Sequence, residues 1–474
     1  MAVAVAPPDL APRVLTGDAP SSPAGPLDSR EPVRLPPART LPRWAQTIRF
    51  GMRPMGFSLA ARAELGDVWR VQLLSRVEHF VVTSHPDHVE SLLRAKPDDA
   101  PSLTGESPLR PVLGPNSVLT SVGERHMRQR KLLLPPFHGD AVERYMQMIT
   151  EVAEREIDGW RAGEELKLAP RMQAVTLKVI MAGIFGIEGT PAPGTLEHRF
   201  YSTIRRLTAI SRNPLWQLVE LRNLGRLEAR GTLKRMLSII DRDLYALIRD
   251  RRARGHVEGA NDVFSLLLAA RDEDGQALSD EELRDELLTL VLAGHETTAN
   301  SLAWTFERLI RAPAPYARLR ELVRDGAGTD AEAGEYVEAT IHEGMRVRPV
   351  IPMIVRLAKR QWRLGDYVLP ADTPVAVSIV ALHHREDTYP QPHLFEPERF
   401  VARKAGTYTW LPFGGGIRRC LGATLAMAEQ RVVLAAIARR TDLEAPDPAP
   451  EPPRQRNVTM IPRDGGRVLV RAKL

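Results

Sequence analysis

The sequence predicts a mainly α-helical fold of the α+β type, in which a helix-rich domain carries small antiparallel β-sheets. Amphipathic periodicity of the helical kind fills the middle of the 474-residue chain. One of these helical runs, residues 280–310, is far longer than the average helix of about 11–12 residues. Short runs that suit β-strands flank the helical middle on both sides.

The predicted elements can be placed in chain order. Residues 68–73 and 79–84 are rich in β-branched side chains and predict a hairpin, and a helix follows to Arg94 with Ser84 in position to cap it. The stretch 96–121, rich in Pro, Gly and Ser, predicts a long ordered loop of a kind that often carries function. Amphipathic helices are predicted at residues 124–134, 140–161, 171–185, 196–209, 227–254, 263–270, 280–310 and 316–324. After a helix that ends near Met345, strands are predicted at 354–357, 362–364, 367–369 and 374–380, and a last helix at 421–440.

Composition and charge exclude several classes of protein. With 43% hydrophobic and 26% charged residues the chain is globular in composition, and its net charge of +6 is too diffuse to indicate a nucleic-acid partner. Residues 1–35 are interrupted by prolines and do not resemble a signal peptide, so a flexible N-terminal segment is expected before a single domain at 36–474. No stretch approaches the ~18 apolar residues of a membrane span. A single cysteine indicates a reducing compartment, so we expect a cytoplasmic protein. We also expect a monomer, without a transmembrane anchor.

The only cysteine, Cys420, lies in a glycine-rich stretch, LPFGGGIRRCLG, at residues 411–422. A buried structural thiol would need neither the glycines nor the arginines, and a nucleophile would need a base that the local sequence does not supply. Zinc and iron–sulfur sites would need further cysteines, whereas a porphyrin-bound metal accepts a single protein sulfur. The surroundings suit a porphyrin. The helix that begins after Cys420 can stabilise a thiolate, the glycines admit a flat macrocycle, and Arg418 can meet a propionate.

The long predicted helix contains a polar interruption, AGHETT at residues 293–298. Glycine costs about 1 kcal/mol relative to alanine in mid-helix, so its presence needs a reason. Threonine can bond the backbone four residues earlier and bend the helix, and Gly294 would remove bulk where a flat ligand approaches. Each residue alone could belong to a solvated face, but the whole cluster favours a functional groove.

Glu343 and Arg346, in ATIHEGMRV, are three positions apart on a predicted helix and can form an ion pair. On an exposed helix such a pair would contribute only about a few tenths of a kcal/mol. Arg399, in FEPERF, would clamp the same carboxylate with a second guanidinium group if the fold brought it to Glu343.

Together these motifs resemble those of the cytochrome P450 family. The spacing F-x-x-G-x-R-x-C-x-G of that family's haem-binding loop is matched by Phe413, Gly416, Arg418, Cys420 and Gly422. AGHETT is similar to the family's oxygen-activation groove, and EGMR with the later PERF resembles its glutamate–arginine–arginine cluster. GERHMRQRKLL, which starts at Gly123, resembles a helix that faces the haem propionates.

The resemblance implies haem b as the cofactor and a role for each matching residue. Cys420 would be the axial thiolate ligand of the haem iron. Thr297 would hydrogen-bond the bound dioxygen and Glu296 would link it to solvent, so that the two relay protons. Glu296 stands where many relatives have aspartate, which keeps the carboxylate and lengthens its reach.

The same resemblance assigns the basic residues. His126, Arg130, Arg356 and Arg418 would face the propionates, although a solvated helix face is the alternative for each. Glu343, Arg346 and Arg399 would lock the fold on the cysteine side of the haem. Gly344 departs from the family pattern and questions the local stability of its helix.

The resemblance therefore implies a monooxygenase that inserts one atom of O₂ into a C–H bond. Electrons would come from a ferredoxin or flavodoxin with its reductase, because the stretch after Cys420 is too short for a reductase domain. Arg418, Arg419 and Arg431 could dock such an acidic partner. A peroxide-driven peroxygenase and a haem-thiolate binding or sensor protein are the alternatives; Glu296 and Thr297 argue against the first.

The substrate pocket is expected to be apolar with few aromatic side chains, which favours a lipophilic small molecule such as a fatty acid, terpenoid or steroid. The resemblance places residues 96–121 and 200–218, the long helix near Leu290 and Ala293, and the VIPMIV stretch around it. Its expected apolar lining residues are Leu103, Leu109, Val112, Leu113, Val350, Ile351, Met353 and Ile354.

Overall fold

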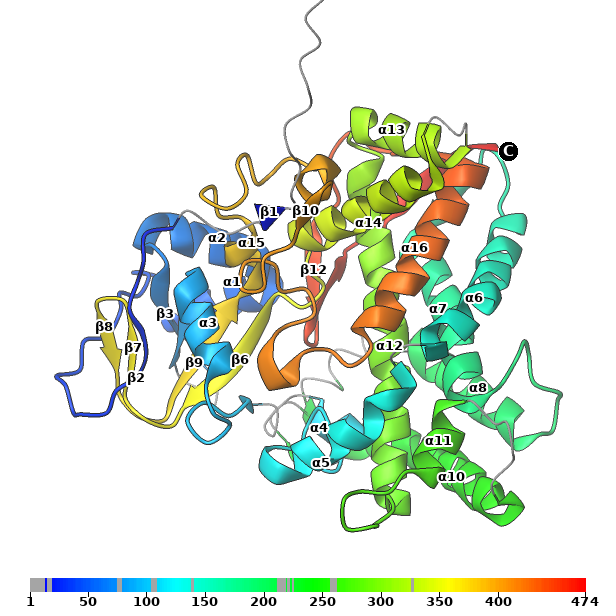
Figure 1. Ribbon diagram of the computed structural model, residues 1–474, viewed down its shortest axis with the longest axis horizontal. Helices are drawn as coiled ribbons and strands as arrows, with labels where there is room; N and C mark the ends of the chain where they lie inside the picture. The colour runs from blue at the N-terminus through cyan, green and yellow to red at the C-terminus, as the bar shows by residue number, and fades with distance from the viewer. Residues whose placement is uncertain are drawn as a thin grey trace, which may run out of the picture.

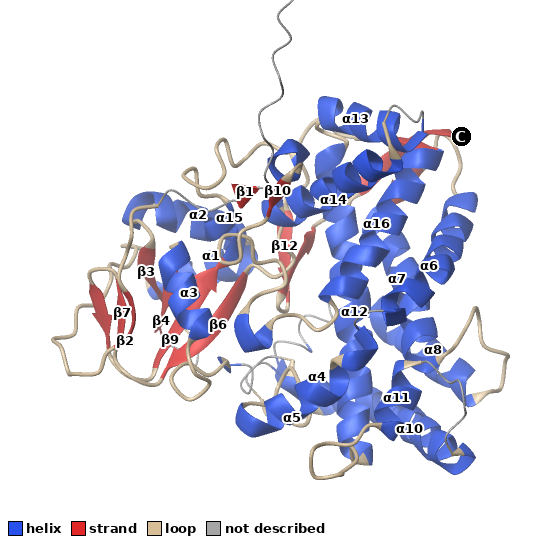
Figure 2. Cartoon of the chain, in the orientation of Figure 1, coloured by secondary structure: helices blue, strands red, loops and turns tan. Residues whose placement is uncertain are grey.

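The computed structural model describes residues 13–14, 19–74, 79–103, 109–137, 140–210, 219, 222–223, 226–255, 262–324 and 328–474. Figure 1 shows a sheet-rich part, which holds most of the N-terminal elements, beside a helix-rich part. Helices dominate the chain and strands form small sheets, as the colouring by secondary structure shows (Figure 2). The predicted α+β class with mainly helical content is confirmed.

The helices run through the whole described chain. They are α1 (Arg43–Met52), α2 (Pro54–Leu65), α3 (Pro86–Arg94), α4 (Arg110–Leu113), α5 (Gly123–Leu133), α6 (Asp140–Asp158), α7 (Leu168–Phe185), α8 (Leu196–Ile210), α10 (Gly231–Arg254), α11 (Val263–Ala269), α12 (Asp280–Leu309), α13 (Pro313–Arg324), α14 (Asp330–Val347), α15 (Ile379–His383) and α16 (Ala423–Arg440).

The strands are short. They are β1 (Arg13–Val14), β2 (Ala24–Pro26), β3 (Val68–Gln72), β4 (His79–Thr83), β5 (Glu165–Lys167), β6 (Met353–Ala358), β7 (Trp362–Leu364), β8 (Tyr367–Leu369), β9 (Thr373–Ser378), β10 (Arg403–Lys404), β11 (Thr441–Glu444), β12 (Pro453–Arg456), β13 (Thr459–Pro462) and β14 (Arg467–Lys473).

The predicted antiparallel sheets are present as β2-β7-β8, β11-β14-β5 and β12-β13, and two further sheets contain a parallel pair. The largest sheet has the order β3-β4-β9-β6, and within it β4 and β9 run parallel with Val81 opposite Val375. A parallel pair needs a long crossover, which these two strands have because nearly 300 residues separate them. The other sheets have the orders β2-β7-β8, β11-β14-β5, β12-β13 and β1-β10.

The helix-rich part is organised around α12, which runs the length of it (Figure 1). A capping box fixes the start of α12: the Ser279 hydroxyl accepts the Glu282 N–H at 3.1 Å, and the Glu282 carboxylate accepts the Ser279 N–H at 2.9 Å. Its main partner is α7, which is apolar enough to cross a membrane but has 72% of its residues buried. Within the described residues α7 therefore serves as a core helix.

Several predicted boundaries are wrong by a few residues. The cap of α3 is His85 and not Ser84, because the Asp87 N–H donates to the His85 ring nitrogen at 3.3 Å. The predicted strand 374–380 ends at Ser378, whose side chain caps the short helix α15. The loop predicted at 96–121 contains α4, and its residues 104–108 lie outside the described part of the chain. Helices α1 and α2 and strands β11–β14 were not predicted.

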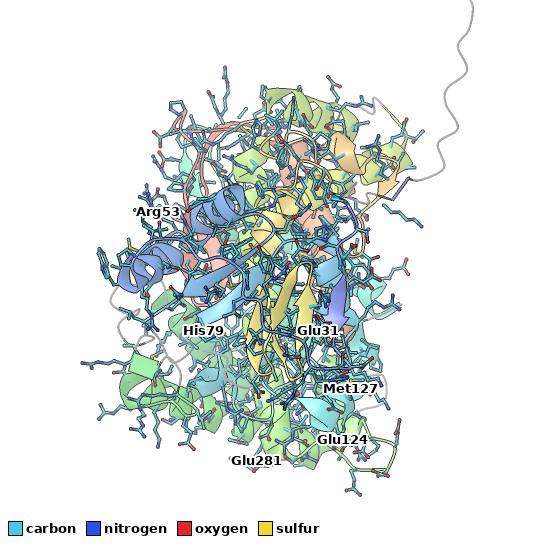
Figure 3. All side chains as sticks on the ribbon, turned by 90° about the vertical axis from the view of Figure 1, so that its left-hand side faces the viewer. Glu31, Arg53, His79, Glu124, Met127 and Glu281 are labelled. Carbon is cyan, nitrogen blue, oxygen red and sulfur yellow. The ribbon has the colours of Figure 1, made fainter. Side chains whose placement is uncertain are left out.

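Residues 19–35 belong to the segment that the sequence predicts to be flexible, yet the structure places them against the sheet-rich part. Strand β2 pairs with β7, with Gly25 opposite Arg363. The Ser22 hydroxyl contacts the His88 ring at 2.9 Å, and the Glu31 N–H donates to the Gln361 side chain at 3.0 Å. Figure 3 shows Glu31 beside the strands. The domain boundary at residue 36 stays a prediction, and residues 1–12 and 15–18 lie outside the described residues.

Candidate functional site

Cys420 lies on a short loop between the 3₁₀ turn Gly416–Arg418 and α16. In Figure 1 the orange segment that leads into α16 runs between the sheet-rich and helix-rich parts. The Cys420 N–H donates to the Phe413 carbonyl at 2.9 Å, which closes the loop over residues 413–420. Gly414 and Gly416 have φ values of 65° and 63°. Glycine adopts this left-handed conformation at little cost, which explains two glycines of the motif by backbone geometry.

The remaining glycines have different reasons, which the sequence did not reveal. A Cβ at Gly415 would lie 2.7 Å from the Leu93 side chain, and one at Gly416 would overlap the Leu93 carbonyl oxygen. These positions need glycine because the loop packs on the end of α3. At Gly422 a Cβ would meet no atom within 4 Å, so this side of the loop is open to a flat group.

The surroundings of the Cys420 thiol shift its pKa in opposite directions. Burial raises its pKa, and the Gly422 N–H together with Arg130 and Arg419 only partly offsets this rise. The predicted stabilisation of a thiolate by the start of α16 is therefore present but is not sufficient alone. A metal cation at the sulfur would supply the missing stabilisation, because a coordinated thiol is deprotonated outright. Although protein surrounds it closely enough to raise its pKa, the Cys420 residue retains exposed surface, as expected of a group that faces an internal space.

Four basic side chains converge beside this loop. His126 and Arg130 come from α5, Arg356 from β6 and Arg418 from the 3₁₀ turn. Burial, followed by Arg418, Arg130 and Arg356, lowers the pKa of His126 to about 4, so its ring is neutral at pH 7. Burial lowers the pKa of Arg356 and of Arg418 to about 10, and for Arg418 the neighbouring arginines add to the effect.

The three arginines form no ion pair with a carboxylate in the described part of the chain. Arg418 donates to the Val118 carbonyl at 3.0 Å and to the Ser121 carbonyl at 2.6 Å, and Arg130 donates to the Arg419 carbonyl at 2.8 Å. Among the residues that the structure describes, the Arg356 side chain donates only to the adjacent Val355 carbonyl, at 3.2 Å. A pocket beside α3 is lined by His126, Arg356 and Arg418 together with apolar side chains. Arg356 is buried and Arg130 and Arg418 are half-buried, and cations that are withdrawn from water in this way are stabilised by an anion.

These observations fit a haem. The cationic cluster, which we define as the cations Arg130, Arg356 and Arg418 with the neutral His126 among them, supplies donors for two propionates. Cys420 supplies a single sulfur ligand, and the side of the loop at Gly422 is open. No group of three or more His, Cys, Asp or Glu side chains that could hold a metal ion occurs among the described residues.

The AGHETT residues, 293–298, lie within the long helix α12, as the sequence predicts. Thr297 Oγ1 donates to the Ala293 carbonyl at 2.7 Å, which is the bond to the preceding turn that bends helices. The Glu296 carboxylate forms an ion pair with Arg456 of β12 at 3.4 Å. Asn300 Nδ2 donates to the Glu296 carbonyl at 2.8 Å. Arg456 was missed by sequence reasoning, because no local pattern links a hairpin residue to a helix 160 positions earlier.

Gly294 serves helix packing rather than ligand approach, which corrects the prediction. A Cβ at this position would lie 2.5 Å from Ile180 Cδ1 on α7. The neighbouring His295 carbonyl accepts the Thr176 hydroxyl of α7 at 2.7 Å. The glycine thus brings α12 and α7 into close contact at the turn that carries Glu296 and Thr297.

The predicted cluster of Glu343, Arg346 and Arg399 is present. Arg346 Nε and Nη2 each donate to the Glu343 carboxylate at 2.7 Å, and both side chains are 0% exposed. Arg399 Nε lies 3.5 Å from the same carboxylate. Gly344 does not interrupt α14: a Cβ there would overlap the Thr305 hydroxyl of α12, so the glycine permits this contact.

His383 links this cluster to the cysteine loop and was not singled out from the sequence. Arg346 donates to the His383 carbonyl at 2.9 Å, and the Leu411 N–H at the start of the loop donates to His383 Nε2 at 2.8 Å. Burial, followed by Arg346, holds the pKa of His383 well below its usual value. A neutral ring with an accepting Nε2 therefore anchors the segment that leads to Cys420.

The expected pocket-lining residues do not all share one environment. Leu113 is buried, and Val112 and Leu290 pack against the main core. Ile351 and Ile354 pack on one sheet cluster, whereas Met353 packs on the other face with Phe57 and Phe80. Residues 211–218 of the expected pocket lie outside the described residues. A common pocket for these side chains stays a prediction.

Comparison with known proteins gives a consistent result. The family model for cytochrome P450 matches residues 35–470. A Mycobacterium tuberculosis protein described as "Putative cytochrome P450 135B1" is 35% identical over 440 residues, which is 92% of each chain. Another from that organism, "Putative cytochrome P450 137", is 37% identical over 368 residues, 77% of this chain and 75% of the relative.

A solved structure gives the same fold. The structure described as "Retinoic acid bound cyanobacterial CYP120A1" matches 94% of this chain and 100% of its own with a TM-score of 0.76. Sequence identity over this match is 21%, so the likeness concerns the fold alone.

Proposed function

The chain belongs to the cytochrome P450 family, whose members bind haem b through a cysteine thiolate, and we propose that it hydroxylates a lipophilic small molecule. In this proposal O₂ supplies the inserted oxygen atom and an external redox partner supplies the electrons. One observation supports this proposal most strongly: Cys420 lies beside the cationic cluster, and the arginines of this cluster have no carboxylate partners among the described residues.

Each residue of the site has a defined task. Cys420 would hold the iron, and His126, Arg130, Arg356 and Arg418 would bind the two propionates. Phe413 and Gly416 shape the loop, Phe413 by accepting the Cys420 N–H and Gly416 by packing on α3. When bound, the haem supplies the activation of O₂, which no side chain of this chain can perform.

Thr297 and Glu296 would handle the protons. The Thr297 hydroxyl now donates to the Ala293 carbonyl, and rotation about its χ1 would turn this proton toward the haem side. The Glu296 carboxylate keeps partial exposure and is held by Arg456, so it can exchange protons with solvent while staying in place. These two groups favour a monooxygenase over a peroxygenase, because peroxide brings its own protons.

The substrate class rests on the apolar character of the expected pocket. A fatty acid, terpenoid or steroid is proposed, and the retinoic acid in the cyanobacterial structure is a terpenoid acid bound by that protein. Val350, Ile351 and Met353 keep partly accessible apolar surface between α14 and the sheet. Such side chains bind hydrocarbon without polar specificity.

We further propose a ferredoxin or flavodoxin as electron donor and a cytoplasmic monomer as the working form. Arg419 is exposed beside the cysteine loop and is available to an acidic partner. Arg431, expected from the sequence to share this role, pairs with Glu338 at 2.8 Å, and Arg418 points inward to backbone carbonyls. The docking role of these two residues is correspondingly weaker.

Oxygen-isotope labelling tests the proposed activity. Lipophilic compounds are first screened for a shift of the haem absorption band, and a positive compound is incubated with ¹⁸O₂, NADPH, a ferredoxin and its reductase. One ¹⁸O atom should enter the product. A product that carries no ¹⁸O from O₂ would contradict the proposal. So would NADPH consumption during which none of the band-shifting compounds is oxidised.

Substitution of Thr297 separates the remaining alternatives. In Thr297→Ala, NADPH consumption should continue while most of it yields hydrogen peroxide, because proton delivery is misdirected. Thr297→Ser, which keeps the hydroxyl, is the matched control and should retain product formation. A peroxygenase would be insensitive to both changes, and a binding or sensor protein would show no consumption to uncouple.

A further inference from the structure

Helix α1 has its apolar and polar sides reversed with respect to the rest of the protein. Its buried position is a glutamine: Gln46 is 0% exposed. Three of its four large apolar side chains point outward, with Trp44 60%, Ile48 52% and Met52 66% exposed. A surface helix of a globular protein normally buries such a stripe. The reversal indicates that something outside the described chain covers it.

The orientation of α1 is fixed by specific contacts. Gln46 Nε2 donates to the Leu41 carbonyl at 2.9 Å, and Gln46 Oε1 accepts the Gln72 N–H at 3.2 Å. On the same side, the Phe50 ring packs edge-on against Phe57 at 5.8 Å and Phe80 at 5.5 Å. A rotation that buried the apolar stripe would break all of these contacts, so the stripe stays exposed.

The exposed residues form one continuous line. Trp44, Ile48 and Met52 are four residues apart and share a face of the helix, opposite Gln46 and Phe50. Leu74 is 61% exposed, and its N–H donates to Thr47 of α1 at 2.9 Å, which places it beside the helix. We call Trp44, Ile48, Met52 and Leu74 the α1 stripe.

The charged residues of α1, and Arg53 directly after it, are all positive. Arg43, Arg49 and Arg53 are exposed on or directly after α1, and the helix contains no acidic residue. Figure 3 shows Arg53 at the edge of the molecule, where α1 meets α2. The nearest acid of α2, Glu64, is occupied by Arg39 at 2.8 Å. The surface that covers the stripe must therefore combine apolar depth with negative charge.

We propose that α1 docks the protein onto the surface of a bilayer that contains anionic lipid. Interfacial helices combine an apolar face carrying Trp with flanking arginines, and they lie in the plane of the membrane. Trp44, Ile48 and Met52 would enter the headgroup boundary while Arg49 and Arg53 bind lipid phosphates. Contact of this kind is peripheral and needs no membrane-spanning segment. The proposal stands on α1 alone and does not depend on the proposed enzyme activity.

Co-sedimentation of the full-length protein with vesicles tests this directly. The probes are vesicles of phosphatidylcholine and vesicles of phosphatidylcholine mixed with phosphatidylglycerol. The double variant Trp44→Ser/Ile48→Ser is compared with the wild type. The matched control is Ile239→Ser, because Ile239 is 46% exposed on α10, outside the stripe. All three changes affect exposed side chains, so thermal unfolding should be little altered.

The wild type and Ile239→Ser should bind the anionic vesicles, and added salt should weaken this binding. The double variant should lose about tenfold or more in partitioning, because two large apolar side chains no longer enter the bilayer. Equal partitioning of the double variant, or no association of the wild type with anionic vesicles, would overturn the proposal. So would self-association of the wild type that the double variant abolishes, since the stripe would then be covered by a second copy of the chain.

Discussion

Two groups of charged side chains that are withdrawn from water contrast in how the protein satisfies them. Glu343 and Arg346 are paired by two hydrogen bonds, and Arg346 also donates to the His383, Pro392 and Leu394 carbonyls. The cationic cluster of His126, Arg130, Arg356 and Arg418 has backbone carbonyls as its only acceptors among the described residues. The first group is complete within the chain, whereas the second needs an external anion. Buried charge that the fold leaves unpaired thus marks the place of a ligand.

The largest effect on stability is expected from removing one partner of the Glu343–Arg346 ion pair. Arg346→Met leaves the Glu343 carboxylate buried with most of its donors removed, so the free energy of unfolding should fall by about 3–5 kcal/mol. Denaturant unfolding of the haem-free variant measures this loss. A loss below about 1 kcal/mol would show that the ion pair does not stabilise the fold on its own, and the contrast between the two groups would disappear.

Glu429 of α16 is a third buried ionisable side chain to set beside these two groups. Its Oε1 has no hydrogen-bond partner among the described residues. Burial raises its pKa from 4.5 to about 8. An acid with a raised pKa in the folded state contributes its stability below pH 4.5 and loses it as the pH rises through about 8.

Glu429→Gln should therefore stabilise the protein relative to wild type at pH 9 by about 3 kcal/mol and have little effect at pH 5. Unfolding midpoints in urea across this pH range give the difference. A constant difference between the two proteins at all pH values would contradict a titrating buried carboxyl group at this position.

A smaller effect of opposite sign is expected in the cationic cluster. Arg356→Met removes a buried cation without an ionic partner, so the haem-free protein should keep its unfolding free energy or gain about 1 kcal/mol. The same variant should release haem about tenfold faster, because a charge-assisted hydrogen bond to a propionate is lost. Haem transfer to a scavenger protein measures the release rate.

Arg360→Met is the matched control for this prediction. Arg360 follows strand β6, which carries Arg356; it is partly exposed and pairs with Asp28 at 3.0 Å. Its replacement should change neither haem release nor stability by more than about 0.5 kcal/mol. Destabilisation of the haem-free protein by Arg356→Met would instead indicate that Arg356 serves the fold and not the cofactor.

Local chemistry explains which features the sequence could predict. The Cys420 loop, the long helix α12 and the Glu343–Arg346 pair depend on residues close together in the chain, and all three are present as expected. The packing reasons for Gly294 and Gly416 were not predictable, because each glycine meets a distant helix.

The missed elements share a physical cause. Strand β12, PRQR, has no alternating pattern and is defined by its pairing with β13. Helix α1 follows a proline-rich segment and carries its apolar residues on the outer face, so it does not show the pattern of a helix packed on a core. The Glu296–Arg456 and Leu411–His383 contacts join distant segments and exist only in the folded chain.

The absorption spectrum of the reduced protein with carbon monoxide tests the central claim, that Cys420 and the cationic cluster together hold a haem by its iron and its propionates. The account predicts a Soret band in the position produced by a thiolate ligand, which a histidine ligand does not give, and loss of that band in Cys420→Ser. A purified protein that takes up no haem, or a Cys420→Ser variant with an unchanged spectrum, would contradict it.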